Sequence, residues 1–117
     1  MTDPRPQDGT PLPMEIEVDD LRALRDAGSA VAVLDVREPW ELEICSLPDS
    51  IDIPMSALPG RLAELPRDRP LVVLCHHGGR SAHATLWLRR NGFGNAVNLG
   101  GGIDAWARRI DPNMRTY

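Results

Sequence analysis

The most reactive group of this chain is a cysteine that stands just before two histidines, two glycines, an arginine and a serine, at positions Cys75, His76, His77, Gly78, Gly79, Arg80 and Ser81. A cysteine attacks as its thiolate, and nearby positive charge and backbone N–H groups favour that form. The two glycines allow backbone angles that turn successive N–H groups inward, into a nest for an anion. The arginine adds a permanent positive charge, the serine can cap a following helix, and the histidines can add charge or carry protons. The segment therefore predicts a catalytic thiolate at Cys75, with residues 76–81 as its substrate-binding loop.

The spacing between the cysteine and the arginine separates two kinds of chemistry. Four residues lie between Cys75 and Arg80, one fewer than in cysteine-dependent phosphatases. A shorter loop makes a tighter cradle, which suits one terminal sulfur atom better than a tetrahedral phosphate. The loop therefore favours sulfur transfer, and it disfavours a phosphatase or an arsenate reductase.

The elements that must position this loop alternate between strands and helices. We expect strands at 14–18, 30–34, 50–53, 71–74 and 96–99, and helices at 20–27, 38–44, 57–65, 81–91 and 103–109, the first of them capped by Asp19. The central strands are wholly apolar, which is typical of an α/β fold whose parallel sheet is covered by helices on both faces. Ligands of such sheets bind beyond the carboxyl ends of the strands, where Cys75 follows the strongest strand. Residues 1–13, with four prolines, predict a disordered lead-in to a single domain at 14–117, and residues 110–117 predict a tail.

Composition excludes several classes of protein. The net charge of −4 argues against a nucleic-acid binder, and all thirteen basic residues are arginines, which excludes a Schiff-base or P-loop lysine. Two cysteines are too few for a secreted disulfide scaffold, and the sequence offers neither an apolar signal segment nor a membrane span. We therefore expect a cytoplasmic protein without a membrane partner. We also expect no metal ion, because adjacent histidines rarely converge on one ion. No cofactor is expected either.

Three further residues carry open alternatives. Asp35 and Arg37 follow the second predicted strand at the active edge of the sheet, and we expect structural support rather than substrate contact. In that interpretation Arg37 pairs with Glu38 or Glu41, and Asp35 bonds loop amides. Cys45 is expected to be a small packing residue, although a redox role as the partner of Cys75 stays open.

Three separated motifs, at residues 34–41, 75–81 and 99–106, give the chain a close resemblance to the rhodanese-like family, and specifically to its stand-alone single-domain bacterial sulfurtransferases. The resemblance spans about residues 15–117 and implies a five-stranded parallel sheet flanked by helices. It also implies that Cys75 takes sulfane sulfur from thiosulfate or another donor as a persulfide and passes it to cyanide or a thiol. One departure is Ser46, which stands where many members have a histidine before the third strand.

A second hypothesis uses the same loop differently. The chain would then be a sulfur carrier or binding module that a partner protein loads with persulfide sulfur. The physiological donor, the acceptor and the oligomeric state do not follow from the sequence.

Overall fold

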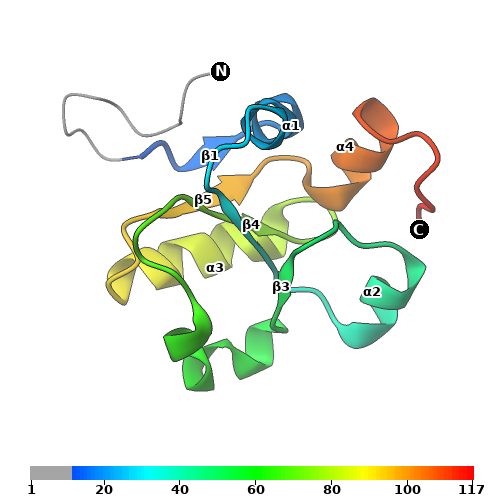
Figure 1. Ribbon diagram of the computed structural model, residues 1–117. Coiled ribbons are helices and arrows are strands. Elements are labelled where there is room, and N and C mark those ends of the chain that lie inside the picture. Colours follow the sequence, from blue (N-terminus) through cyan, green and yellow to red (C-terminus); the bar gives the residue numbers. More distant parts are fainter. Residues whose placement is uncertain (1–11) are drawn as a thin grey trace.

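The computed structural model describes residues 12–117, and its centre is a sheet of five parallel strands (Figure 1). The strands are β1 (Glu15–Ile16), β2 (Ala32–Asp35), β3 (Ile51–Asp52), β4 (Leu71–Leu74) and β5 (Ala96–Leu99), in the spatial order β1-β5-β4-β2-β3. In the register of the sheet, Asp35 lies opposite Leu74 and Val73 lies opposite Asn98. Since all strands are parallel, their carboxyl ends meet at one edge, as the sequence predicts.

Helices cover both faces of this sheet, which confirms the predicted α/β architecture (Figure 1). The helices are α1 (Val18–Asp26), α2 (Pro39–Ile44), α3 (Gly79–Arg90) and α4 (Gly102–Arg109), with two 3₁₀ segments at Met55–Gly60 and Leu62–Glu64. Helices α1 and α4 pack on one face, where Leu21 and Ile103 join the first apolar cluster. Helix α3 and the 3₁₀ segments pack on the other face, where Leu58 and Leu88 join the second cluster. The two clusters hold the strands rigidly between them.

The predicted helix at 57–65 is wrong in type. The chain there forms two short 3₁₀ segments, and Pro59 lies inside the first of them. Proline has no N–H to donate and crowds the preceding turn, so it does not suit an α-helix interior. The apolar spacing of Leu58 and Leu65 nevertheless reports burial correctly, since both side chains are buried.

Two predicted helix caps are also wrong. Helix α1 begins at Val18 rather than after Asp19, because Glu17 and Asp20 form a capping box around its first turn. Helix α3 begins at Gly79, two residues before the predicted cap Ser81, and its N-cap is Gly78 with φ of 107°. A positive φ at the cap suits glycine, so the turn after Cys75 is tighter than the sequence suggests.

The lead-in predicted at 1–13 lies almost entirely outside the described residues. At its end, Leu12 is buried in the first apolar cluster, and its carbonyl oxygen accepts a hydrogen bond from Arg89 Nη2 at 3.1 Å. Arg89 Nη2 also donates to the carbonyl oxygen of Pro13 at 2.8 Å. Packed structure therefore begins before the predicted start at Met14. Within residues 12–117, no helix has the length and apolar character to cross a membrane.

Candidate functional site

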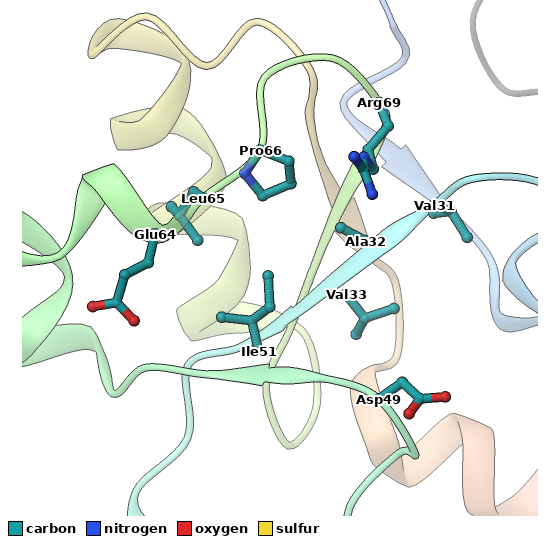
Figure 2. Close-up of a pocket in the computed structure, with 9 residues that line it drawn as sticks. All are labelled: Val31, Ala32, Val33, Asp49, Ile51, Glu64, Leu65, Pro66 and Arg69. Atoms are coloured by element: carbon teal, nitrogen blue, oxygen red, sulfur yellow. The ribbon is translucent and has the colours of Figure 1, made fainter.

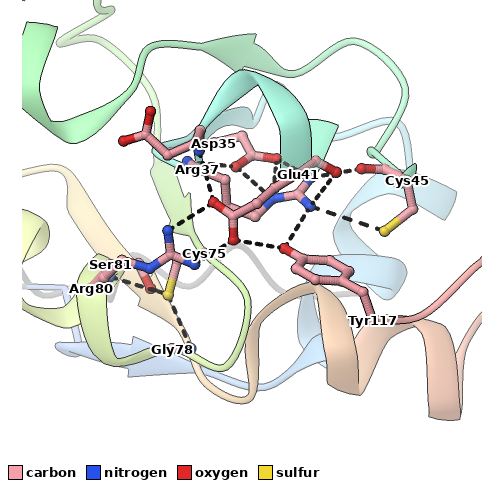
Figure 3. A network of polar contacts seen from close by, with 10 residues as sticks. Asp35, Arg37, Glu41, Cys45, Cys75, Gly78, Arg80, Ser81 and Tyr117 are labelled. Carbon is pink, nitrogen blue, oxygen red and sulfur yellow. Dashed lines mark hydrogen bonds and ion pairs between the residues drawn. The ribbon is translucent and has the colours of Figure 1, made fainter. Parts of the chain in front are cut away.

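Cys75 lies at the carboxyl end of β4, with its sulfur enclosed by the start of α3 (Figure 3). Its Sγ is 3.1 Å from the Gly78 backbone nitrogen, 3.3 Å from the Ser81 backbone nitrogen and 3.4 Å from Ser81 Oγ. Cys75 is 1% exposed. Two backbone N–H groups at a helix N-terminus thus point at the sulfur, an arrangement that stabilises negative charge there.

Gly102, the first residue of α4 and the last of three consecutive glycines, packs directly behind the loop. The first turn of α4 donates to it, through the Ile103 nitrogen to the Cys75 carbonyl oxygen at 2.9 Å and the Asp104 nitrogen to the His76 carbonyl oxygen at 3.0 Å. A Cβ on Gly102 would lie 2.5 Å from each of these oxygens, and its φ is +61°. Glycine is therefore required at 102 by both close approach and backbone angle.

Arg80 is paired, which changes its predicted role as a free positive charge. Its guanidinium donates to both carboxylate oxygens of Glu41, at 2.7 and 2.8 Å. The Glu41 side chain is 3% exposed, and Arg80 lowers its pKa from 4.5 to about 2. The interaction raises the pKa of Arg80. The positive charge beside the loop is thus offset by a buried carboxylate from α2, a partner that the sequence analysis did not assign to Arg80.

Arg37 and Asp35 form a second ion pair, which is fully buried. The Arg37 Nη2–Asp35 Oδ2 distance is 2.7 Å, and both side chains are 0% exposed. Arg37 also donates to the carbonyl oxygens of Glu41 and Cys45 at 3.3 and 2.8 Å. The predicted pairing of Arg37 with the carboxylates of Glu38 or Glu41 is wrong, because Asp35 lies within direct reach two residues earlier. These contacts fasten α2 to the end of β2, which fits structural support.

Tyr117 completes the same network, a role that no pattern in the sequence predicts. Its hydroxyl donates to Glu41 Oε1 at 3.0 Å and accepts from Arg37 Nη1 at 3.1 Å (Figure 3). Its ring stacks on His76 at 3.8 Å with an interplanar angle of 6°, and the exposed Trp40 meets it edge-on at 5.8 Å. Tyr117, at the end of the segment 110–117 that was predicted only as a tail, therefore packs against the active-site edge. A single tyrosine in a polar tail carries no sequence signal for this role.

His76 and His77 directly follow the nucleophile and differ in their exposure to solvent. Burial and the neighbouring His77 lower the pKa of His76 below its usual value. His77 is exposed, and its Nδ1 lies 3.8 Å from Asp104 Oδ2. These three side chains hold ligand-type atoms within 4.8 Å of one another. Asp104 Oδ2 also accepts a hydrogen bond from Arg108 Nε at 2.9 Å, and the two histidine rings lie 3.9 Å apart between centroids with an interplanar angle of 34°.

Asn98 is a second polar residue that the sequence analysis missed. It is 2% exposed in β5 and contacts both Ser81 Oγ and the Gly78 carbonyl oxygen, directly behind the sulfur. The predicted strand gave a signal for it, because Asn98 is the one polar residue in the otherwise apolar Ala96–Leu99.

Cys45 lies away from the nucleophile. Its sulfur is 4.0 Å from Arg37 Nη1, and Figure 3 places it on the far side of the Arg37–Glu41–Tyr117 network from Cys75. Both cysteines are free thiols. Its contacts fit the expected packing role, and the redox role stays a prediction.

The hollow drawn in Figure 2 belongs to the opposite end of the sheet. It has a volume of about 430 Å³ and is lined by the amino-terminal parts of β2 and β3, together with Leu65, Pro66 and Arg69. A smaller cavity of about 280 Å³ lies between α3 and the first 3₁₀ segment, where His83 and Trp87 form part of its wall. His83 is exposed.

Sheet order, loop and helix positions together define a rhodanese-like domain, and comparison with known families agrees. The Rhodanese-like domain family matches residues 17–109, so the chain belongs to that family. A sulfurtransferase of Allochromatium vinosum is 42% identical over 78 residues, which cover 67% of this chain and 73% of the relative. The structure of a rhodanese-related protein from Thermoplasma volcanium matches with a TM-score of 0.76 at 40% identity, over 84% of this chain and 94% of that one.

A third relative is larger. The probable adenylyltransferase/sulfurtransferase MoeZ of Mycobacterium tuberculosis is 41% identical over 100 residues, which cover 84% of this chain but only 26% of MoeZ. The named relatives therefore support sulfur transfer in general as the activity of this domain.

Proposed function

We propose that this protein is a thiosulfate sulfurtransferase of the rhodanese type that carries sulfane sulfur on Cys75 as a persulfide. The observation that carries the proposal is the pair of backbone N–H donors, from Gly78 and Ser81, that lie 3.1 and 3.3 Å from the one buried sulfur of Cys75. The donors sit at a helix N-terminus, so they favour a sulfur that bears negative charge. A cysteine that only fills space in the core does not require such hydrogen-bond donors around its sulfur.

In the first half-reaction, the Cys75 thiolate attacks the outer sulfur of thiosulfate. A new S–S bond forms at Cys75 as the old S–S bond breaks, and sulfite leaves with the electron pair of that bond. In the second half-reaction, cyanide or a thiolate attacks the terminal sulfur and releases the Cys75 thiolate. Each step replaces one nucleophile by another on the transferred sulfur, so the covalent intermediate divides one transfer into two.

The loop residues take separate parts in this scheme. The Gly78 and Ser81 amides hold the charge on the Cys75 sulfur. The turn that aims them is made by Gly78, at φ +107°, and Gly79 begins α3. Arg80 lies close enough to Cys75 to interact with its charge. His76 and His77 line the edge over which donor and acceptor arrive.

A sulfur carrier loaded by a partner protein is the second candidate, and the Arg80–Glu41 pair favours it. With Glu41 offsetting Arg80 at 2.7 Å, the loop has less positive charge for a small dianion such as thiosulfate. A protein persulfide needs no such charge. The cytoplasmic location inferred from the sequence stays a proposal for either function.

The experiment is a kinetic panel of donors and acceptors. Thiosulfate and a neutral organic persulfide serve as donors, and cyanide and a thiol serve as acceptors. We expect Cys75→Ala to lose all turnover while keeping the circular dichroism spectrum of the folded protein, and Cys45→Ala to keep its activity as the matched control. Turnover of Cys75→Ala at the wild-type rate would overturn the proposal. Slow turnover with every small donor, combined with fast loading by a cysteine desulfurase, would select the carrier.

A further inference from the structure

Asn98 is a buried amide in a strand that is otherwise apolar. It lies in β5 opposite Val73 of β4, on the face of the sheet that packs against α3, as do Ala96 and Cys75. The residue is 2% exposed. A buried side-chain amide has to find hydrogen-bond partners within the protein, and the choice of partners is informative.

The partners fix which way the amide faces. Asn98 Nδ2 lies 2.9 Å from Glu15 Oε1 and 3.3 Å from the Gly78 carbonyl oxygen. Both of these atoms only accept hydrogen bonds, so they require the NH₂ group at that position. The Asn98 carbonyl oxygen, Oδ1, is therefore the atom that faces Ser81 Oγ at 2.5 Å.

Ser81 has one hydroxyl hydrogen and two neighbours for it. Asn98 Oδ1 cannot donate, so the short contact requires Ser81 to donate to Asn98. Ser81 Oγ then presents its lone pairs to Cys75 Sγ, 3.4 Å away. A thiol S–H at Cys75 can donate to those lone pairs, whereas a thiolate is repelled by them. The thiolate gains the hydroxyl only if Ser81 rotates and leaves the buried Asn98 oxygen without its donor.

We propose that Asn98 is a positioning residue that holds the Ser81 hydroxyl hydrogen and so withholds this third hydrogen-bond donor from the resting Cys75 sulfur. The inference deepens the proposed function and rests on Cys75 as its nucleophile. When Cys75 ionises, its proton leaves to solvent, and Ser81 rotates its O–H from Asn98 Oδ1 to the sulfur. No covalent bond at Ser81 or Asn98 changes.

The charged groups around Cys75 do not take part in this exchange. Arg80 approaches from α3 with its partner Glu41 on α2, and the Asp35–Arg37 pair stands at the end of β2. Glu15 faces the far side of Asn98 from β1, where it is exposed, and the weakly basic His76 follows Cys75 in the loop. A change at Asn98 removes the hydrogen bond to Glu15, but it does so both with and without the Ser81 hydroxyl, so the difference between the two backgrounds reports the hydroxyl.

The test is a double-mutant cycle read by NMR, with the ¹³Cβ signal of Cys75 followed against pH in the absence of any sulfur donor. We expect Asn98→Leu to lower the titration midpoint by about one pH unit, because the hydroxyl is then free to donate to the thiolate. In a Ser81→Ala background, the same Asn98→Leu change is expected to move the midpoint by less than a third of that shift.

Two controls separate this from a general loosening of the loop. Thr85→Val removes another buried hydroxyl of α3, one that donates to the Ser81 carbonyl oxygen at 2.7 Å, and should leave the midpoint unchanged. Asn98→Asp keeps an acceptor beside Ser81 and adds negative charge, so it should raise the midpoint. Asn98→Ala replaces Asn98→Leu if the larger side chain prevents folding.

Two outcomes would overturn the proposal: a midpoint that Asn98→Leu or Asn98→Ala leaves unchanged, or an equal shift in the presence and absence of the Ser81 hydroxyl. The measurement is independent of sulfur transfer. If the cycle behaves as expected but the protein transfers no sulfur, the proposed function fails and the positioning role stands.

Discussion

Replacing Glu41 by glutamine tests how the site is held together. The Glu41 carboxylate accepts four hydrogen bonds, two from Arg80, one from Tyr117 and one from the Glu38 backbone nitrogen. A glutamine keeps the size of the side chain but loses the charge. It also turns an NH₂ group towards donors that need an acceptor. We therefore expect Glu41→Gln to destabilise the fold strongly at neutral pH.

The size of this destabilisation and its pH dependence follow from the Glu41–Arg80 ion pair. The pKa of Glu41 falls from 4.5 to about 2, mainly because of Arg80. That shift corresponds to about 3 kcal/mol of unfolding free energy at pH 7, as an upper figure because Arg80 is partly exposed. A lowered carboxylate pKa stabilises the fold fully above 4.5, and the stabilisation is lost as the pH falls towards 2. By pH 3, about 2 kcal/mol of it should be gone.

The assay is urea denaturation of both proteins at pH 7, 5, 4 and 3. The difference in unfolding free energy between wild type and Glu41→Gln should be largest at pH 7 and shrink steadily below pH 4.5. Glu64→Gln is the matched control, since Glu64 also forms a two-bond pair with Arg61 but at the exposed surface, and it should have little effect. A difference for Glu41→Gln that stays constant from pH 7 to pH 3 would refute the role of its charge.

Three further changes probe other parts of the site. Arg37→Met leaves Asp35 as an unpaired buried charge and should cost about 3 to 5 kcal/mol of unfolding free energy, measured by urea denaturation; adding Asp35→Asn should recover part of the loss, and no recovery would contradict the pairing. Gly102→Ala forces a Cβ against the Cys75 and His76 carbonyl oxygens at a positive φ and should cost about 2 kcal/mol or more, whereas Gly60→Ala, with open space around it, should cost far less; similar melting temperatures for the two variants would argue against the close approach. Arg80→Ala leaves the Glu41 carboxylate unpaired beside the loop, so kcat/KM should fall more for thiosulfate than for a neutral persulfide donor; equal losses would remove the charge argument.

The sequence predicted the strands, the helices and the parallel sheet well, because buried segments show as runs of apolar residues. Apolar runs such as Leu71–Leu74 identified the strands, and their alternation with helices identified the parallel sheet that the structure confirms. The loop at Cys75 followed from the same logic, since it joins a buried strand to a helix start. The helix caps were less predictable, as at Glu17, because several polar residues compete for one cap.

The polar network around the loop lay beyond sequence reasoning for a different reason. Arg80 meets Glu41 across 39 positions, and Tyr117 reaches Glu41 across 76. Such pairs depend on how the sheet edge brings distant segments together, which no local pattern encodes. Asn98 is the residue of this network that could most readily have been predicted, because a single amide inside an apolar strand requires a buried hydrogen-bond partner.

The measurement that tests the central claim most directly is the intact mass of the protein after incubation with thiosulfate and removal of excess donor. We expect the wild-type chain and Cys45→Ala each to gain the mass of one sulfur atom, and peptide mapping to place it on Cys75. The added mass should disappear when cyanide is supplied, with thiocyanate formed in equal amount. A chain that never gains sulfur from thiosulfate, or a Cys75→Ala variant that gains as much as the wild type, would contradict the persulfide at Cys75.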